Sequence, residues 1–86
     1  MSVWHESETP PPDEPTGSAY RLSVGTLVTF APDASDMNPR RRAGWSAAIK
    51  LESGFYHFFG YGKSERLAIA DTIRQLQTLV KEIDSL

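Results

Sequence analysis

The C-terminal part of the chain constrains the fold most, because its apolar residues recur at the spacing of an α-helix. From Ile69 onward they follow one another in steps of four, three, four and three residues. The five positions form one stripe: Ile69, Ile73, Leu76, Val80 and Ile83. Ser64 is a favourable N-cap, and Glu65 in the first turn suits the positive end of the helix dipole. The pattern predicts one long amphipathic helix whose stripe packs on a sheet.

The segments before this helix carry strand patterns. Residues 20–32 are rich in β-branched and aromatic side chains and end at a proline, which predicts a first strand, with Gly25 marking a bulge or an irregular start. Residues 45–52 alternate apolar and polar side chains, and residues 55–61 are aromatic, which predicts two more strands joined by a two-residue turn at 53–54. The sequence thus predicts an α+β domain: an antiparallel three-stranded meander with one long C-terminal helix packed on one face.

Two further segments are predicted to lie outside these elements. The polar stretch 33–44 contains Pro39 and Gly44, which predicts a long loop. Residues 1–18 carry four acidic residues and no basic ones, a charge of −4, together with several prolines. We therefore expect an acidic, Pro-rich, disordered tail at 1–18 and a single β-β-β-α domain at 19–86. A short docking peptide anchored by Trp4 is the alternative for the tail.

The composition argues against several functional classes. The chain has no cysteine, which removes disulfides and thiolate metal sites. No apolar run approaches the ~18 residues of a membrane span, and the N-terminus lacks the pattern of a signal peptide. We therefore expect a cytoplasmic protein with no membrane partner. Residues 20–86 carry nine basic and seven acidic residues, a net charge of +2, which is low for a nucleic-acid-binding module.

The predicted sheet has a second face that no element of the chain covers. A two-residue turn pairs Glu52 with Phe55 and fixes which side chains point there. The residues expected on that face are Lys50, Phe55, His57, Phe59 and Tyr61. A three-residue loop would instead move the side chains of the third strand to the opposite face. Four rings in a row form an apolar patch that a soluble monomer seldom exposes.

Three interpretations of this face are open. It dimerises or docks another protein; it stacks unpaired bases; or the start of the first strand, the Trp4 segment or a change of register covers it. We expect the first, a non-enzymatic interaction module that binds a protein partner or a second copy of itself. Short proteins of this kind are common in phages and mobile elements, where they occlude a host complex, so an inhibitor of that type is one expectation.

The segment HFFGYGKS, residues 57–64, approaches the phosphate-loop pattern but has His57 where the first glycine is required. The phosphate loop also belongs to a parallel βαβ sheet, for which this chain is too short. His5 lies in the tail, and His57 has aromatic neighbours and no carboxylate at a useful spacing. We therefore expect no catalytic residues, no metal and no cofactor.

The stretch GYGKSERLAIADTIRQLQTL resembles the end of a double-stranded RNA-binding domain, where a glycine-bounded strand runs into Gly-x-Ser-Lys-Lys-x-Ala and an alanine-rich helix. The matching residues are Gly60, Gly62, Lys63, Ser64 and Ala68. In that family, basic residues at the helix start bind phosphates across the RNA major groove. The resemblance implies this role for Lys63 and Arg66, whereas Glu65 stands where the family has lysine.

The same order of strands and helix also resembles small antitoxins of the HicB type, which form dimers and bind a partner protein. The predicted loop carries Arg40, Arg41 and Arg42. In double-stranded RNA-binding domains the corresponding hairpin loop enters a minor groove. Nucleic-acid binding through these three arginines, Lys63 and Arg66 is therefore the alternative function.

Overall fold

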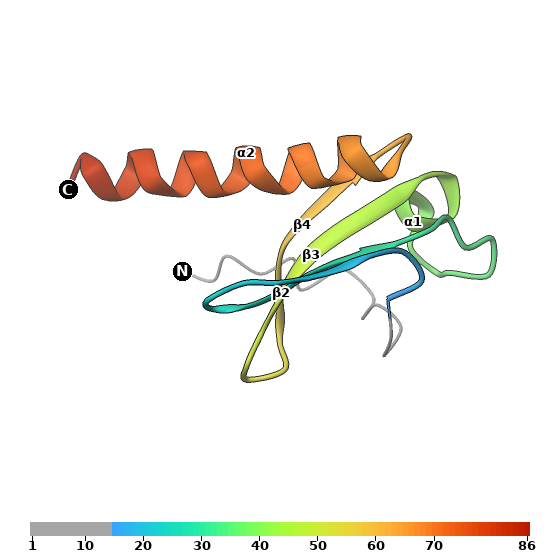
Figure 1. Cartoon of the computed structure of the whole chain (residues 1–86). Helices are drawn as coiled ribbons and strands as arrows, with labels where there is room; N and C mark the ends of the chain where they lie inside the picture. Colours follow the sequence, from blue (N-terminus) through green and yellow to red (C-terminus); the bar gives the residue numbers. More distant parts are fainter. Residues whose placement is uncertain (1–14) are drawn as a thin grey trace.

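The computed structural model describes residues 15–86, which form an antiparallel sheet with a long C-terminal helix on one face (Figure 1). The strands are β1 (Ala19–Arg21), β2 (Gly25–Phe30), β3 (Trp45–Leu51) and β4 (Tyr56–Gly62). They lie in the sheet in chain order. Helix α1 (Pro39–Ala43) joins β2 to β3, and α2 (Glu65–Asp84) follows β4. The predicted α+β class and C-terminal helix are confirmed, but the sheet has four strands rather than three.

The fourth strand arises because the segment predicted as one strand folds back on itself. The chain reverses at residues 23–24, where the amide of Leu22 donates to the carbonyl of Gly25 at 2.8 Å. Tyr20 of β1 then pairs with Leu27 of β2. A Cβ on Gly25 would lie 2.2 Å from the carbonyl oxygen of Lys50, so the close approach of β2 to β3 requires glycine here.

The predicted loop 33–44 contains α1 and is internally hydrogen bonded. Asn38 caps α1, because its side chain accepts from the amide of Arg40 at 2.9 Å, and Pro39 occupies the first helical position. Arg41 is 2% exposed, and its Nε lies 2.9 Å from the carboxylate of Asp36. A buried ion pair therefore fixes α1 to the segment that precedes it.

The β3–β4 hairpin turns through three residues, 52–54, so the predicted two-residue turn is wrong. The amide of Leu51 donates to the carbonyl of Phe55 at 2.9 Å. Gly54 has a φ of 94°, a left-handed value that glycine adopts most easily. Next to the turn, Ile49 therefore pairs with His57, one position away from the predicted register.

A β-bulge then restores the predicted register. Phe58 and Phe59 occupy the position opposite the single residue Ala48, and beyond them Ser46 pairs with Tyr61 as predicted. Phe58 has a φ of 59°, a left-handed conformation that costs a non-glycine residue roughly 1–2 kcal/mol. The bulge therefore divides β4 into two parts of opposite side-chain parity.

Helix α2 lies directly on the backbone of β4. A Cβ on Gly60 would lie 2.4 Å from the carbonyl oxygen of Ala68 and 2.5 Å from the amide nitrogen of Thr72. The expected N-cap is confirmed, because Ser64 Oγ accepts from the amide of Leu67 at 3.2 Å. Glycine at position 60 is thus what lets helix and strand meet this closely.

Side chains of α2 also hydrogen bond to the outer edge of β4. Thr72 Oγ1 donates to the carbonyl of Phe58 at 2.9 Å, and the side-chain amide of Gln75 donates to the carbonyl of Phe59. The carboxylate of Asp71 accepts from the amide of Tyr61. Because β4 is an edge strand, these bonds use backbone groups that another strand would otherwise pair with.

Candidate functional site

The sheet face away from α2 carries the main apolar cluster. Its buried members are Val28, Phe30, Ala48 and Phe59, and Tyr56 and Tyr61 pack against them. We call these six residues the aromatic face. The ring of Tyr56 lies 6.1 Å from that of Phe30 and 6.3 Å from that of Phe59, measured between centroids. Phe30 is 2% and Phe59 7% exposed, so the centre of the aromatic face is core.

The segment containing α1 contacts one end of the aromatic face at Tyr61. The guanidinium of Arg40 lies 4.6 Å from the centroid of the Tyr61 ring, within cation–π range. Asn38 Nδ2 donates to the Tyr61 hydroxyl at 3.4 Å. Tyr61 therefore already has polar and cationic neighbours within the chain.

The five residues predicted to bind a partner do not lie together. Phe59 and Tyr61 belong to the aromatic face, and Lys50 lies on the same side of the sheet, with its Nζ 5.5 Å from the ring centroid of Tyr56. His57 pairs with Ile49 and so points to the α2 side, because the three-residue turn shifts the parity before the bulge. Phe55 lies beside the turn and is 64% exposed. Tyr56 lies on the aromatic face instead of Phe55 and His57, which were expected there.

His57 lies in a partly apolar setting on the α2 side of the sheet. Partial burial lowers the pKa of His57 below its ordinary value, because desolvation disfavours the charged imidazolium. His57 is therefore neutral at physiological pH, which suits a packing role.

The basic residues predicted to bind nucleic acid gather at one end of the sheet, apart from Arg41. A Cβ on Gly44 would lie 2.6 Å from the carbonyl oxygen of Gly62, so the end of α1 meets the junction of β4 and α2. The segments that meet here carry four exposed basic side chains: Arg40, Arg42, Lys63 and Arg66. Arg42 donates to the carbonyls of Asp36 and Met37 at 2.8 and 3.1 Å. Buried Arg41 has a structural role.

Polar contacts at the start of α2 join it to β2 and to the segment before β1. Thr29 Oγ1 donates to the carboxylate of Glu65 at 2.6 Å. Hydrogen bonds from the side chains of Thr29 and Ser18 lower the pKa of Glu65. The amide of Gly17 donates to the carbonyl of Thr29 at 3.0 Å, although residues 15–18 were assigned to the tail. The rest of the predicted tail, with Trp4, lies outside the described residues.

The apolar stripe of α2, which we call the helix seam, is Ile69, Ile73, Leu76, Val80 and Ile83. The prediction that the seam packs on the sheet is wrong for three of its members: Ile73, Val80 and Ile83 are 46%, 56% and 55% exposed. The fully buried residues of α2 are instead Ala68 and Thr72. At about 100° per residue, they lie roughly a quarter-turn around the helix from the seam.

The orientation of the helix seam follows from the hydrogen bonds of α2. Asp71 and Gln75 bind the outer edge of β4. At about 100° per residue, Ile73 and Val80 lie on the opposite side of the helix. The seam therefore faces over the sheet toward β2 and β1, where Tyr20 on the same side is 49% exposed. Apolar side chains of helix and sheet thus border the same open side of the molecule.

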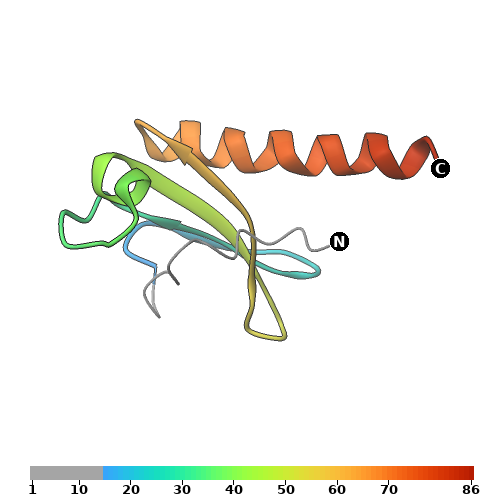
Figure 2. The same ribbon diagram turned by 180° about the vertical axis from the view of Figure 1, so that it is seen from behind.

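The exposure of the seam can be inferred from the sequence by comparing the length of the predicted helix with that of the strands. A helix of 20 residues is about 30 Å long, whereas a strand of seven residues spans about 23 Å. The end of α2 therefore extends past the sheet, as Figures 1 and 2 show. The apolar residues of that end have no strand beneath them.

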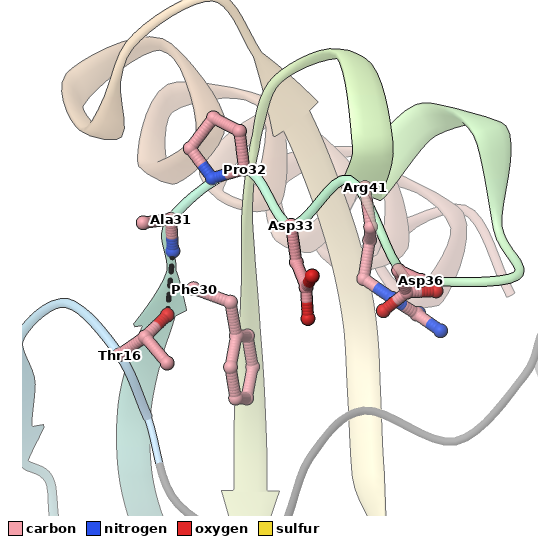
Figure 3. Close-up of a pocket in the computed structure, with 7 residues that line it drawn as sticks. All are labelled: Thr16, Phe30, Ala31, Pro32, Asp33, Asp36 and Arg41. Atoms are coloured by element: carbon pink, nitrogen blue, oxygen red, sulfur yellow. Dashed lines mark hydrogen bonds and ion pairs between the residues drawn. The ribbon is translucent and has the colours of Figure 1, made fainter.

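A small pocket of about 150 Å³ lies where the segment before β1 meets the end of β2 (Figure 3). Its walls are Thr16, Phe30, Ala31, Pro32, Asp33, Asp36 and Arg41. The amide of Ala31 donates to Thr16 Oγ1 at 2.7 Å across its rim. Within residues 15–86 no three His, Cys, Asp or Glu side chains are grouped to hold a metal ion. None of the helices described here is long and apolar enough to span a membrane.

Comparisons with known proteins found no match. No protein-family model, no curated protein and no solved structure matches the chain. Of the resemblances expected from the sequence, the structure bears out only a general layout, an antiparallel sheet followed by a C-terminal helix.

Proposed function

We propose that this protein is a non-enzymatic interaction module that binds protein through the helix seam. The observation that supports the proposal is the exposure of Ile73, Val80 and Ile83 along one side of α2. Leu86, just beyond the helix, is also fully exposed. A contiguous apolar strip of this kind is typical of surfaces that bind a partner helix. From the sequence we expect an inhibitor that occludes a host complex, and such an inhibitor would bind that complex through the helix seam.

The aromatic face is a weaker candidate for the binding surface. Phe30 and Phe59 are buried, and the ring of Tyr61 lies against Arg40. A partner at that face would gain little new apolar burial, because hydrophobic stabilisation scales with the apolar area removed from water. The helix seam offers large aliphatic side chains that are about half exposed.

Site-directed photo-crosslinking in cells tests the proposal. A photoreactive amino acid at Val80 is compared with the same group at Thr78, which is exposed on the other side of α2. We expect protein adducts, identified by mass spectrometry, from position 80 and not from position 78. Equal labelling at both positions, or adducts to nucleic acid alone, would overturn the proposal.

A second candidate function is nucleic-acid binding at the basic end of the sheet. The observation in its favour is that four exposed basic residues lie at the same end of the sheet: Arg40 and Arg42 on α1, Lys63 between β4 and α2, and Arg66 on α2. If they bind phosphates, affinity for duplex RNA falls steeply as salt is raised. The variant Arg40→Ala/Lys63→Ala then reduces both affinity and salt dependence, whereas Lys81→Ala on α2 changes neither. Equal affinity of all three proteins would exclude this function.

A further inference from the structure

We infer that the partner of the helix seam is a second copy of this chain, bound with the two α2 helices antiparallel. The inference rests on the proposed function, because it names the occupant of the same surface. The seam residues recur in alternating steps of four and three, the repeat that two packed helices share along a coiled-coil contact. The same helix surface therefore fits against itself.

One antiparallel register matches the seam to itself without a polar residue in the contact. The two-fold axis crosses the helix pair at the height of Thr78, whose side chain itself points away from the contact. At this register Ile73 of one chain lies level with Ile83 of the other. Leu76 then lies level with Val80 of the second copy. Four of the five seam residues thus meet an aliphatic side chain of the second copy, and because of the two-fold axis each contact occurs twice.

The orientation of the pair follows from the helix dipoles, which attract when the two helices are antiparallel and repel when they are parallel. The charges of Arg74 and Glu82 do not enter the contact. At about 100° per residue each lies about 140° around α2 from the middle of the seam, and Arg74 bonds Asp71 at 2.8 Å on the side of β4.

The fold leaves room for this contact. The strands lie beneath the first part of α2, and its end extends past them (Figures 1 and 2). The two sheets of the pair therefore lie toward opposite ends of the helix contact. The end of each α2 then runs beside the middle of the other, on the side where Tyr20 is exposed. The ring of Tyr20 loses water contact together with the seam.

The size of the contact sets the expected affinity. Two overlapping helix ends bury less than the roughly 1,200 Å² in total that marks the lower end of standard interfaces. We therefore expect a reversible dimer in the micromolar range. Sedimentation equilibrium over a hundredfold range of concentration should show the average mass rising from that of one chain toward twice that value.

Crosslinking tests the register. Because the chain has no cysteine, Gln77→Cys and Thr78→Cys each introduce a single thiol, at exposed neighbouring positions on different sides of α2. Gln77 borders the seam near the two-fold axis, whereas Thr78 points away from the second copy. With a short bis-maleimide reagent we expect at least tenfold more dimer from Gln77→Cys than from Thr78→Cys. Thermal unfolding verifies that both variants fold alike.

Three outcomes separate the inference from the function on which it rests. A concentration-dependent dimer with selective crosslinking at Gln77→Cys supports both. A monomer at every concentration whose position 80 photo-crosslinks to a different protein overturns the second copy as partner and leaves the proposed function standing. A monomer without adducts at position 80 overturns both.

Discussion

The amide of Tyr61 donates a hydrogen bond to the carboxylate of Asp71, 3.0 Å away. This bond joins the edge strand to the helix that follows it, and the side chains of Thr72 and Gln75 add two more bonds along the same edge. Helix α2 thus closes β4 to pairing with another strand. An interaction through this side of the molecule therefore uses side chains of the helix and not the sheet edge.

Replacing Asp71 by alanine should lower the stability of the fold. The variant leaves the amide of Tyr61 without its acceptor and removes the ion pair with Arg74 at 2.8 Å. We expect the free energy of unfolding, measured by urea denaturation, to fall by about 1–3 kcal/mol, the usual cost of a lost charged hydrogen bond. Asp84→Ala, at the exposed end of α2, should change it by less than about 0.5 kcal/mol. Equal effects of the two variants would contradict the role of Asp71.

A methyl group at position 60 should push α2 away from β4. Gly60→Ala places a Cβ against backbone atoms of Ala68 and Thr72, which cannot move aside independently. We expect a loss of about 1–3 kcal/mol, the range for overpacking, with large amide chemical-shift changes throughout α2. Gly54→Ala also strains the chain, because its φ is 94°, but nothing lies within 4 Å. Its shift changes should remain in the hairpin.

The three consecutive arginines should differ sharply in their effect on stability. Arg41→Ala removes the buried guanidinium that lies 2.9 Å from the largely buried carboxylate of Asp36. Breaking a buried ion pair on one side costs about 3–5 kcal/mol. Arg40→Ala and Arg42→Ala remove exposed side chains and should cost about 1 kcal/mol or less. A test of nucleic-acid binding therefore has to leave Arg41 in place.

Stability should fall with acidification partly through Glu65. Hydrogen bonds from Thr29 and Ser18 lower the pKa of the folded carboxyl, so its contribution is present above the unfolded pKa, about 4.5, and is lost as pH falls through the lower folded value. Glu65→Gln should flatten this part of the pH dependence. In Thr29→Val, an NMR titration should show the pKa of Glu65 moving up toward 4.5. An unchanged pKa would refute the contribution of Thr29.

Local patterns in the sequence predict the elements better than their pairing. The alternation of residues 45–52 and the cap at Ser64 identify β3 and the start of α2 correctly. Gly25 was a sign of irregularity, but the reversal before it depends on residues 22–24, which have no strong turn signature. The three-residue turn and the bulge at Phe58 compensate one another. Such paired irregularities follow from the twist of the sheet and leave no mark in side-chain alternation.

The candidate site was less accessible from sequence, because the periodicity of a helix shows that a stripe exists but not what it faces. The pair Gly60 and Gly62 draws α2 onto β4, and Ala68 and Thr72 rather than the seam then meet the strand. The small residues Gly60 and Gly62 decide how α2 is oriented on the sheet, and the hydrophobic pattern of the sequence does not reveal their effect. The burial of Phe59 was hidden for a related reason, since its side of the strand depends on the bulge.

The most direct test of the helix seam as the binding surface is sedimentation equilibrium of three proteins: the natural chain, Val80→Glu and Tyr61→Ser. Val80→Glu puts a charge in the seam at an exposed position, whereas Tyr61→Ser alters the aromatic face. Self-association of the natural chain should be lost in folded Val80→Glu and retained in folded Tyr61→Ser. Loss in Tyr61→Ser with retention in Val80→Glu would show that the aromatic face binds instead and would contradict this account.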